Sequence, residues 1–211
     1  MKIYLDTADV KEVHKHWGTG LIDGVTTSLT TIRLIGRNPD DVYAELLNMG
    51  VEHLCMEVEG GILEMMSEAE RLNGLYGDAA VIRVPCTRDG LFVCKELTKK
   101  GIRVSVMLVY SAAQAILAHK AGAVFVTVAI GDLDAQSVAG LEVVRSIAEI
   151  LPRDRTQVVA SSIESIQRVV RSFYNGASIV AMPPKVFSQM YDHALTRENL
   201  RYKECTPSLF E

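Results

Sequence analysis

The sequence contains no apolar run approaching the ~20 residues that a transmembrane helix requires. Its N-terminus, MKIYLDTADV, lacks the long apolar stretch of a secretory signal peptide. Basic residues form no stripe along the chain, and the formal net charge of −4 leaves few cations to displace the counterions of a nucleic acid. We therefore expect a cytoplasmic protein that binds neither membranes nor nucleic acids.

Paired cysteines are also absent. No C-x-x-C motif occurs, and no histidine stands at metal-ligand spacing from a cysteine. The four cysteines are Cys55, Cys86, Cys94 and Cys205. This usage favours reduced thiols packed as small apolar side chains, without a structural metal.

The chain does have enough apolar residues for one sizeable core, with 211 residues of which 48% are hydrophobic. Short apolar runs recur along it, and several are apolar throughout, as parallel strands covered by helices are. The predicted strands are residues 3–7, 24–28, 53–58, 80–84, 103–109, 124–130, 157–162 and 178–182.

Helical patterns separate these runs. The predicted helices are residues 40–49, 60–77, 89–101, 111–122, 137–152 and 162–176, with a further one in the segment PKVFSQMYDH. Eight strand-then-helix units fit a closed (β/α)8 barrel or an open doubly wound sheet. No G-x-G-x-x-G motif follows the first strand, which weakens the case for a dinucleotide cofactor. The number of units favours the single-domain barrel, and we expect no cofactor.

In such a barrel, residues at the carboxyl ends of the strands form the active site. Asp6, Glu57 and Arg83 stand out there, because each interrupts an apolar run. An unpaired charge in a dry interior is costly, so at least two of these three groups are expected to meet.

Six segments together resemble the small transaldolases and fructose-6-phosphate aldolases, in matching order and spacing. They are YLDTADV, GLIDGVTTS, MEVEG, VIRVPCTRDGL, VYSAAQAILAHKAGA and VVASSIES. The resemblance covers residues 1 to about 190 and implies a class I aldolase-like (β/α)8 TIM barrel. It also implies a homo-oligomer, a pentamer or decamer, in which residues 191–211 form a C-terminal helix or tail that packs on a neighbouring subunit.

The family forms an imine between a strand-four lysine and a ketose, and that lysine lies in the motif V-V-K-[VI]-P-x-T. Here the motif reads VIRVPCT, which places Arg83 at the lysine position. A Schiff base needs a free amine lone pair, whereas a guanidinium stays protonated in proteins. The other lysines near these segments, Lys95, Lys99, Lys100, Lys120 and Lys185, fall on helices or in turns. The imine route is therefore predicted to be closed.

Further positions of the resemblance differ from the family pattern. Ser28 replaces an asparagine that binds substrate, Met107 replaces a threonine that holds a water, and Asp132 and Glu164 replace basic residues of the phosphate site. The positions that match are Asp6, Thr26, Thr27, Glu57 and Ser162. Carboxylates at a phosphate site repel the ligand, so an unphosphorylated small molecule is the expected ligand.

Two interpretations of Arg83 remain open. It is a buried cation bonded to Glu57, Asp6 or both, or it polarises a carbonyl or holds a substrate carboxylate while Asp6 or Glu57 acts as general base. The predicted catalytic residues are thus Asp6, Glu57 and Arg83. The predicted substrate-binding residues are Thr26, Thr27, Ser28, Met107, Asp132, Ser162 and Glu164. A nucleophilic Cys86 and a metal held by Asp6 and Glu57 are less favoured, since no histidine activates the thiol and Arg83 would compete for the carboxylates.

Three functions follow. The first is a repurposed lyase- or isomerase-type enzyme that performs imine-free acid–base chemistry, namely proton transfer, dehydration, cyclisation or retro-aldol cleavage. The second is a catalytically silent homologue that binds a ligand or a partner. The third is an ordinary aldolase or transaldolase disabled at its lysine.

Overall fold

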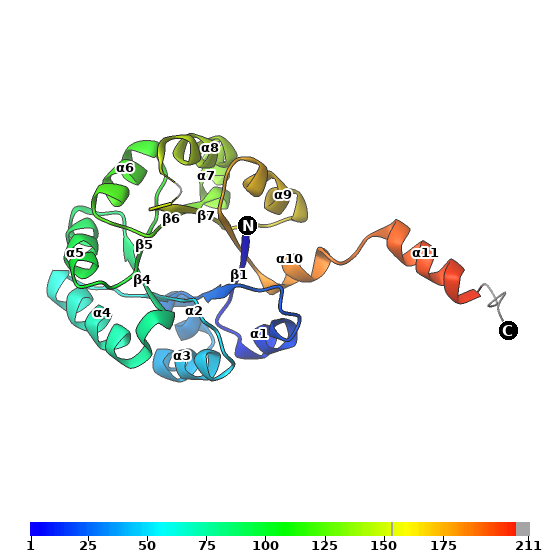
Figure 1. Cartoon of the computed structure of the whole chain (residues 1–211), viewed down its shortest axis with the longest axis horizontal. Helices are drawn as coiled ribbons and strands as arrows, with labels where there is room; N and C mark the ends of the chain where they lie inside the picture. The colour runs from blue at the N-terminus through cyan, green and yellow to red at the C-terminus, as the bar shows by residue number, and fades with distance from the viewer. Residues whose placement is uncertain (153, 206–211) are drawn as a thin grey trace.

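The computed structural model describes residues 1–152 and 154–205, and its strands form a closed parallel barrel in the order β1 to β8. The strands form a ring, and most of the helices surround it (Figure 1). The strands are β1 Lys2–Asp6, β2 Gly24–Thr26, β3 Leu54–Glu57, β4 Ala80–Pro85, β5 Val104–Met107, β6 Phe125–Ala129, β7 Gln157–Ser161 and β8 Ile179–Met182. This architecture confirms the predicted TIM barrel and excludes the open doubly wound sheet.

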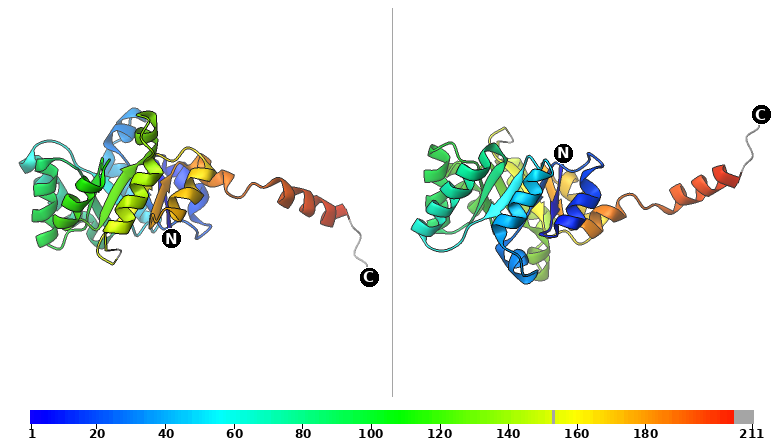
Figure 2. Two further views of the ribbon diagram at one scale, coloured as in Figure 1. Left: turned by 90° about the horizontal axis from the view of Figure 1, so that it is seen from above. Right: turned by 90° about the horizontal axis from the view of Figure 1, so that it is seen from below.

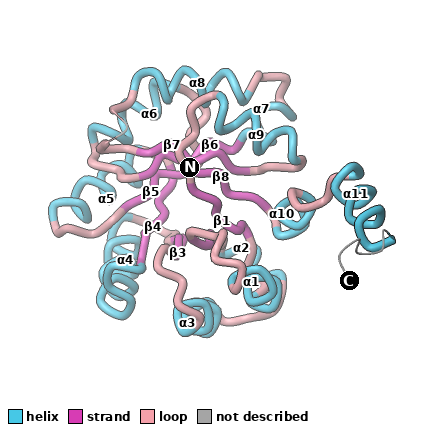
Figure 3. Tube along the Cα trace, turned by 45° about the vertical axis from the view of Figure 1, so that its right-hand side comes forward, coloured by secondary structure: helices cyan, strands magenta, loops and turns pink. Residues whose placement is uncertain are grey.

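Helices follow the strands, and all but the last of them lie around the outside of the ring (Figure 3). They are α1 Val10–Trp17, α2 Leu29–Leu34, α3 Pro39–Asn48, α4 Ile62–Tyr76, α5 Arg88–Lys99, α6 Ala112–Lys120, α7 Ile130–Ala135, α8 Gly140–Ile150, α9 Ile166–Tyr174, α10 Pro184–Gln189 and α11 Ala194–Cys205, and a 3-10 turn, η1 Gly77–Ala79, precedes β4. Several begin on a side-chain cap, since Asp9, Asn38, Thr87 and Ser111 each accept a backbone N–H of the first turn.

The apolar side chains form two layers. Alternate strand residues such as Leu5, Met56 and Val84 pack outward against the helices. Inside the amino-terminal half of the barrel, a smaller cluster that includes Tyr4 and Phe125 closes the interior. The space left for polar chemistry is therefore the carboxyl-terminal half of the barrel and its mouth.

The predicted strands are confirmed, but six of the eight were placed one or two residues too long at their carboxyl ends. Ser28 is the N-cap of α2 and not part of β2. β5 ends at Met107, because the next residue, Leu108, has a left-handed φ of +57°. Ile130 already begins α7. The sequence prediction missed α1, α2 and α7, of which α2 and α7 span only six residues each and carry little helical periodicity.

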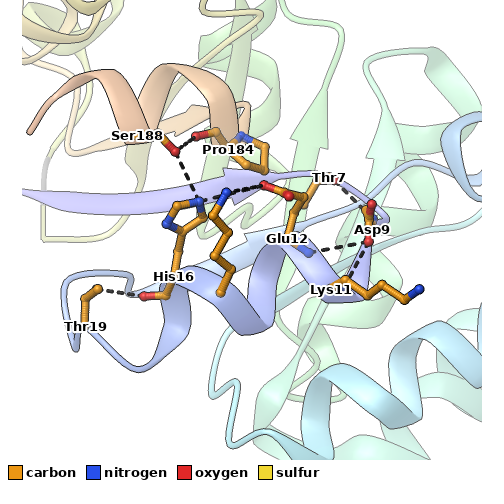
Figure 4. A network of polar contacts seen from close by, with 9 residues as sticks. Thr7, Asp9, Lys11, Glu12, His16, Thr19, Pro184 and Ser188 are labelled. Atoms are coloured by element: carbon orange, nitrogen blue, oxygen red, sulfur yellow. Dashed lines mark hydrogen bonds and ion pairs between the residues drawn. The ribbon is translucent and has the colours of Figure 1, made fainter. Parts of the chain in front are cut away.

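The first and last helices of the barrel are joined by a polar contact. Ser188 of α10 lies 3.2 Å from Nε2 of His16 of α1, and its hydroxyl also donates to the carbonyl of Pro184 (Figure 4). The His16 ring packs edge-on against Phe187, with ring centroids 5.3 Å apart. These contacts anchor α10 to the barrel.

Beyond α10 the chain leaves the barrel. Helix α11 projects away from it in both views of Figure 2, and the large apolar side chains Leu195 and Leu200 are exposed by 60% and 54%. Residues 206–211 and the side chain of Cys205 lie outside the described part of the chain. No helix within residues 1–152 and 154–205 is long and apolar enough to cross a membrane.

Candidate active site

The barrel places the three predicted catalytic residues near the carboxyl ends of β1, β3 and β4. Asp6 ends β1 opposite Thr26 of β2, and Glu57 ends β3 opposite Arg83 of β4. Arg83 in turn lies opposite Ser105 of β5. Because successive strand residues alternate between the two faces, these positions share the inner face of the barrel.

Arg83 is bonded to backbone and not to a carboxylate. Its Nη1 donates to the carbonyl oxygen of Thr27 at 2.7 Å. The carboxylate oxygens of Asp6 and Glu57 lie more than 4.0 Å from the Arg83 nitrogens, so neither residue forms an ion pair with Arg83. The bond to Thr27 is the single hydrogen bond that the Arg83 side chain makes to the described residues. The expectation of a direct ion pair was therefore wrong: the guanidinium is drawn toward a carbonyl at the end of β2.

Asp6 is a buried carboxyl beside this cation. Burial raises its pKa above the ordinary value of 3.8, and the positive charge of Arg83 opposes part of that shift. Removal of water from the charged form is the larger effect, so Asp6 retains its proton to higher pH than an exposed aspartate. This moves the group toward the pH range in which a carboxyl exchanges protons efficiently.

The Glu57 carboxylate points toward the N-terminus of α2. Its Oε2 accepts the backbone N–H of Leu29 at 3.2 Å, at the first residue of α2, where a negative charge is favourable. Glu57 also lines a surface cavity of about 310 Å³, which Arg33 and Tyr43 line as well. The carboxylate thus positions the turn between β2 and α2.

A second, smaller cavity of about 40 Å³ lies inside the barrel below Arg83. Its polar lining consists of Asp6, Thr26, Arg83, Ser105, Thr127 and Ser161. The hydroxyls of Ser105 and Thr127 lie 3.1 Å apart, and the ring of Tyr4 belongs to the same lining. Asp6 and Arg83 therefore share an interior polar site that Glu57 does not line.

The sequence analysis missed Ser105, Thr127 and Ser161. The signal for them is present: each is a lone hydroxyl in an otherwise apolar strand, in VSVM, FVTVA and QVVAS. Alternate residues of a strand share one face. Once the register pairs Ser105 with Arg83, the hydroxyl residues of the neighbouring strands can be assigned to the inner face.

The predicted binding residues have diverse surroundings. Thr27 is fully buried, and its hydroxyl donates to the carbonyl of Cys55 at 3.3 Å. Ser28 accepts the backbone N–H of Thr31 at 3.1 Å and so caps α2. Met107 is buried at the end of β5, 7% exposed. Of these residues, Thr27 touches Arg83 directly.

At the mouth, Asp132 of α7 lies against β7. Tyr110 donates its hydroxyl to Oδ2 of Asp132 at 3.0 Å, and Ser162 donates to Oδ1 at 3.4 Å. Ser162 has φ of +57°, a left-handed conformation that is unusual for serine. A Cβ at Gly131 would lie 2.5 Å from the Ser162 hydroxyl, so the close approach of these two segments requires glycine. Glu164 is exposed and makes none of these contacts.

The remaining candidates can be placed as well. Cys86 follows β4, and burial raises the pKa of its thiol, which disfavours the nucleophilic thiolate. Cys55, Cys86 and Cys94 are free thiols. Within the described residues, no three histidine, cysteine, aspartate or glutamate side chains lie close enough to hold a metal ion.

Comparison with known proteins bears on the fold and on the family of the chain. The thiamine phosphate pyrophosphorylase of Pyrococcus furiosus superposes with a TM-score of 0.59 at 18% identity, over 86% of this chain and 85% of that one, which supports the barrel fold alone. The family model described as Transaldolase/Fructose-6-phosphate aldolase matches residues 3–211.

Two curated relatives are similar along nearly their whole length. A "Probable transaldolase" of Nitrosopumilus maritimus is 37% identical over 204 residues, covering 95% of this chain and 91% of that protein. A "Probable transaldolase" of Chelativorans is 38% identical over 203 residues, covering 95% and 93%. The chain therefore belongs to the transaldolase/fructose-6-phosphate aldolase family.

Proposed function

We propose that this protein is a member of that family that performs acid–base chemistry without forming an imine, on an unphosphorylated small molecule. The observation that carries the proposal is the position of Arg83. Arg83 lies at the position that the resemblance of VIRVPCT to the family motif assigns to the lysine, and no lysine lines the cavity next to it. A guanidinium has no free lone pair to attack a carbonyl.

Asp6 is the group best suited to move a proton. It lines the same cavity as Arg83, and its raised pKa matches a role in proton transfer. Asp6 as a carboxylate takes a proton from the carbon next to a substrate carbonyl or carboxylate group. The electron pair of that C–H bond moves toward the oxygen, whose charge the Arg83 cation stabilises. Asp6 then returns the proton to another carbon or to a departing hydroxyl, which leaves as water.

Glu57 takes a positioning role in this scheme. It holds the N-terminus of α2, whose preceding turn carries the Thr27 carbonyl that Arg83 contacts. A general-base role for Glu57 is the weaker version of the proposal, because Glu57 lines the separate 310 Å³ cavity.

Deuterium exchange tests the proposal directly. Unphosphorylated hydroxy-carbonyl and hydroxy-acid compounds are incubated with the protein in D₂O and followed by proton NMR for loss of the signal at the exchanging carbon. We expect exchange that Asp6→Asn lowers by about 10²–10⁴-fold, the usual contribution of a general base. Exchange that survives in both Asp6→Asn and Glu57→Gln would eliminate the acid–base scheme.

Two other functions remain in competition. A silent homologue that binds a ligand is supported by the same loss of the lysine, and any robust turnover by purified protein removes it. An ordinary aldolase disabled at one position is supported by the family match, and it requires that Arg83→Lys alone restores imine formation.

The proposed protein is a cytoplasmic homo-oligomer. The exposed apolar residues of α11 support packing of residues 191–211 on a neighbouring copy, with residues 1–190 as the barrel, in the pentamer or decamer that the family resemblance implies. The free thiols of Cys55, Cys86 and Cys94 support a cytoplasmic location.

A further inference from the structure

Among the described residues, no carboxylate forms an ion pair with Arg83. Its guanidinium carries five N–H donors, of which the Thr27 carbonyl accepts one. The remaining donors of this half-buried cation are not among the buried, unpartnered side-chain atoms of the described residues, so they stay accessible to solvent or to a ligand. Such a group favours an anion supplied by a ligand.

Neither nearby carboxyl group forms an ion pair with this cation. Asp6 lies beyond the 4.0 Å ion-pair distance from Arg83, and Glu57 accepts the N–H of Leu29. Two cations of the neighbouring 310 Å³ cavity differ from Arg83: Arg33 is paired with Glu59, and Arg71 with Asp40 and Glu68.

The cavity next to Arg83 is small and polar. One water-sized group requires roughly 10–15 Å³ of cavity measured in this way, so a cavity of about 40 Å³ accepts a group of about three non-hydrogen atoms. The Ser105 and Thr127 hydroxyls lie on the β5 and β6 side of it, and Ser105 is the register partner of Arg83. Hydroxyls and a guanidinium are donors that together suit an anionic oxygen.

We infer that this cavity binds the carboxylate group of a small organic acid, with one oxygen on Arg83 and the other on the Ser105–Thr127 hydroxyl pair. A carboxylate has three non-hydrogen atoms and fills a cavity of this size. The inference rests on the proposed function for its chemistry, since it places the next carbon of the acid beside Asp6. It therefore names the substrate class as short hydroxy or oxo monocarboxylic acids.

A phosphate group fits the same place less well. It is larger, with five non-hydrogen atoms, and the mouth above the cavity carries the acidic Asp132 and Glu164. A dianion approaching through that mouth is repelled, whereas a monoanion carries half the charge.

Binding of matched acids and amides tests the inference on the full-length protein. Acetate is compared with acetamide, and glycolate with glycolamide, by saturation-transfer NMR titration at fixed ionic strength. We expect each acid to bind at least tenfold more tightly than its amide, which has the same shape without the charge. Arg83→Gln should remove that difference, and Ser105→Ala and Thr127→Val should weaken the acids by several-fold.

Arg171→Gln is the control for loss of a positive charge. Arg171 is an exposed residue on α9, on the outside of the barrel, and the variant should bind acetate as the unmodified chain does. Should Arg83→Gln fail to fold, the acid–amide comparison on the unmodified chain and on Ser105→Ala still decides the question.

The possible results separate this inference from the proposed function. Equal binding of acids and amides, or acid binding that Arg83→Gln leaves unchanged, overturns the inference. Inorganic phosphate that displaces acetate with higher affinity than glycolate also overturns it. Arg83-dependent acid binding without any exchange of carbon-bound protons supports the inference and contradicts the proposed acid–base activity. Proton exchange on neutral carbonyl compounds without acid binding supports the proposed acid–base activity and contradicts the carboxylate site.

Discussion

The guanidinium of Arg83 donates to the backbone carbonyl of Thr27 at 2.7 Å and forms no ion pair with Asp6 or Glu57. This contact joins β4 to the turn after β2 across the mouth of the barrel. It leaves the positive charge available to a ligand, because a carbonyl dipole neutralises less charge than a carboxylate does. The chemistry proposed above depends on that availability.

Asp6→Asn is expected to stabilise the protein at neutral pH while it lowers the exchange activity by about 10²–10⁴-fold. The pKa of Asp6 is raised from 3.8, chiefly by burial. Between 3.8 and the raised pKa, the folded chain binds more protons than the unfolded chain, so the free energy of unfolding falls as pH rises through this window. Asparagine does not titrate, so the variant should lose this part of the pH dependence.

Thermal unfolding between pH 3 and pH 8 measures this effect. Asp154→Asn, at an exposed aspartate, serves as the control and should follow the unmodified chain. A melting temperature of Asp6→Asn that falls below that of the unmodified protein at neutral pH would mean that the charged carboxylate stabilises the fold, contrary to the burial argument.

Substitutions of Glu57 should separate its charge from its hydrogen bond. Glu57→Gln keeps an oxygen that accepts the N–H of Leu29, whereas Glu57→Ala leaves that N–H without its partner. We expect Glu57→Ala to lose about 1 kcal/mol of stability, or about 2–4 °C in melting temperature for a chain of this length. Glu57→Gln should lose much less.

Activity assays on the same two variants then distinguish the roles of Glu57. A positioning residue predicts that Glu57→Gln retains most of the exchange activity and that Glu57→Ala loses it together with stability. Complete loss of activity in a stable Glu57→Gln protein would show that Glu57 is itself the base.

Removal of the acidic groups at the mouth should allow phosphate to bind. Asp132→Asn preserves an acceptor for Tyr110 and Ser162, and Glu164→Gln changes an exposed side chain. Each substitution is expected to raise the affinity for inorganic phosphate by roughly two- to fivefold, because the interaction between two exposed charges contributes ~0.4–1 kcal/mol. Calorimetric titration measures this, and unchanged phosphate affinity in the double variant would place the ligand elsewhere.

Deletion of residues 192–211 should reduce the size of the assembly. Helix α11 extends away from the barrel, and its contacts include the ion pair between Arg197 and Asp192 and the hydrogen bond from Asn199 to the Leu195 carbonyl. Sedimentation velocity on the full chain and on a chain ending at Tyr191 checks this. Leu195→Asp is the milder variant and should shift the distribution in the same direction. Identical sedimentation of all three proteins would contradict the packing of α11 on a neighbour.

The barrel itself could be predicted from the sequence, because eight apolar runs separated by helical segments leave few alternatives. Short helices such as α2 could not, since six residues contain too little periodicity to distinguish a helix from a loop. Asp6 and Arg83 were recognisable because they interrupt apolar strands. The direction of the Glu57 side chain was not, because it depends on where the turn at Leu29 lies in space. Ser105 and Thr127 were overlooked because a lone hydroxyl in a strand gains significance only when the register places it next to Arg83.

Reductive trapping most directly tests the claim that this barrel forms no imine. The unmodified chain and Arg83→Lys are each incubated with dihydroxyacetone and with fructose 6-phosphate, reduced with borohydride and analysed by intact and peptide mass spectrometry. We predict no adduct on the unmodified chain with either sugar. We also predict none with fructose 6-phosphate on Arg83→Lys, because Asp132 and Glu164 still oppose the phosphate. A reduced sugar adduct on the unmodified polypeptide would contradict the account, and an adduct with fructose 6-phosphate on Arg83→Lys would instead indicate an ordinary aldolase disabled at one residue.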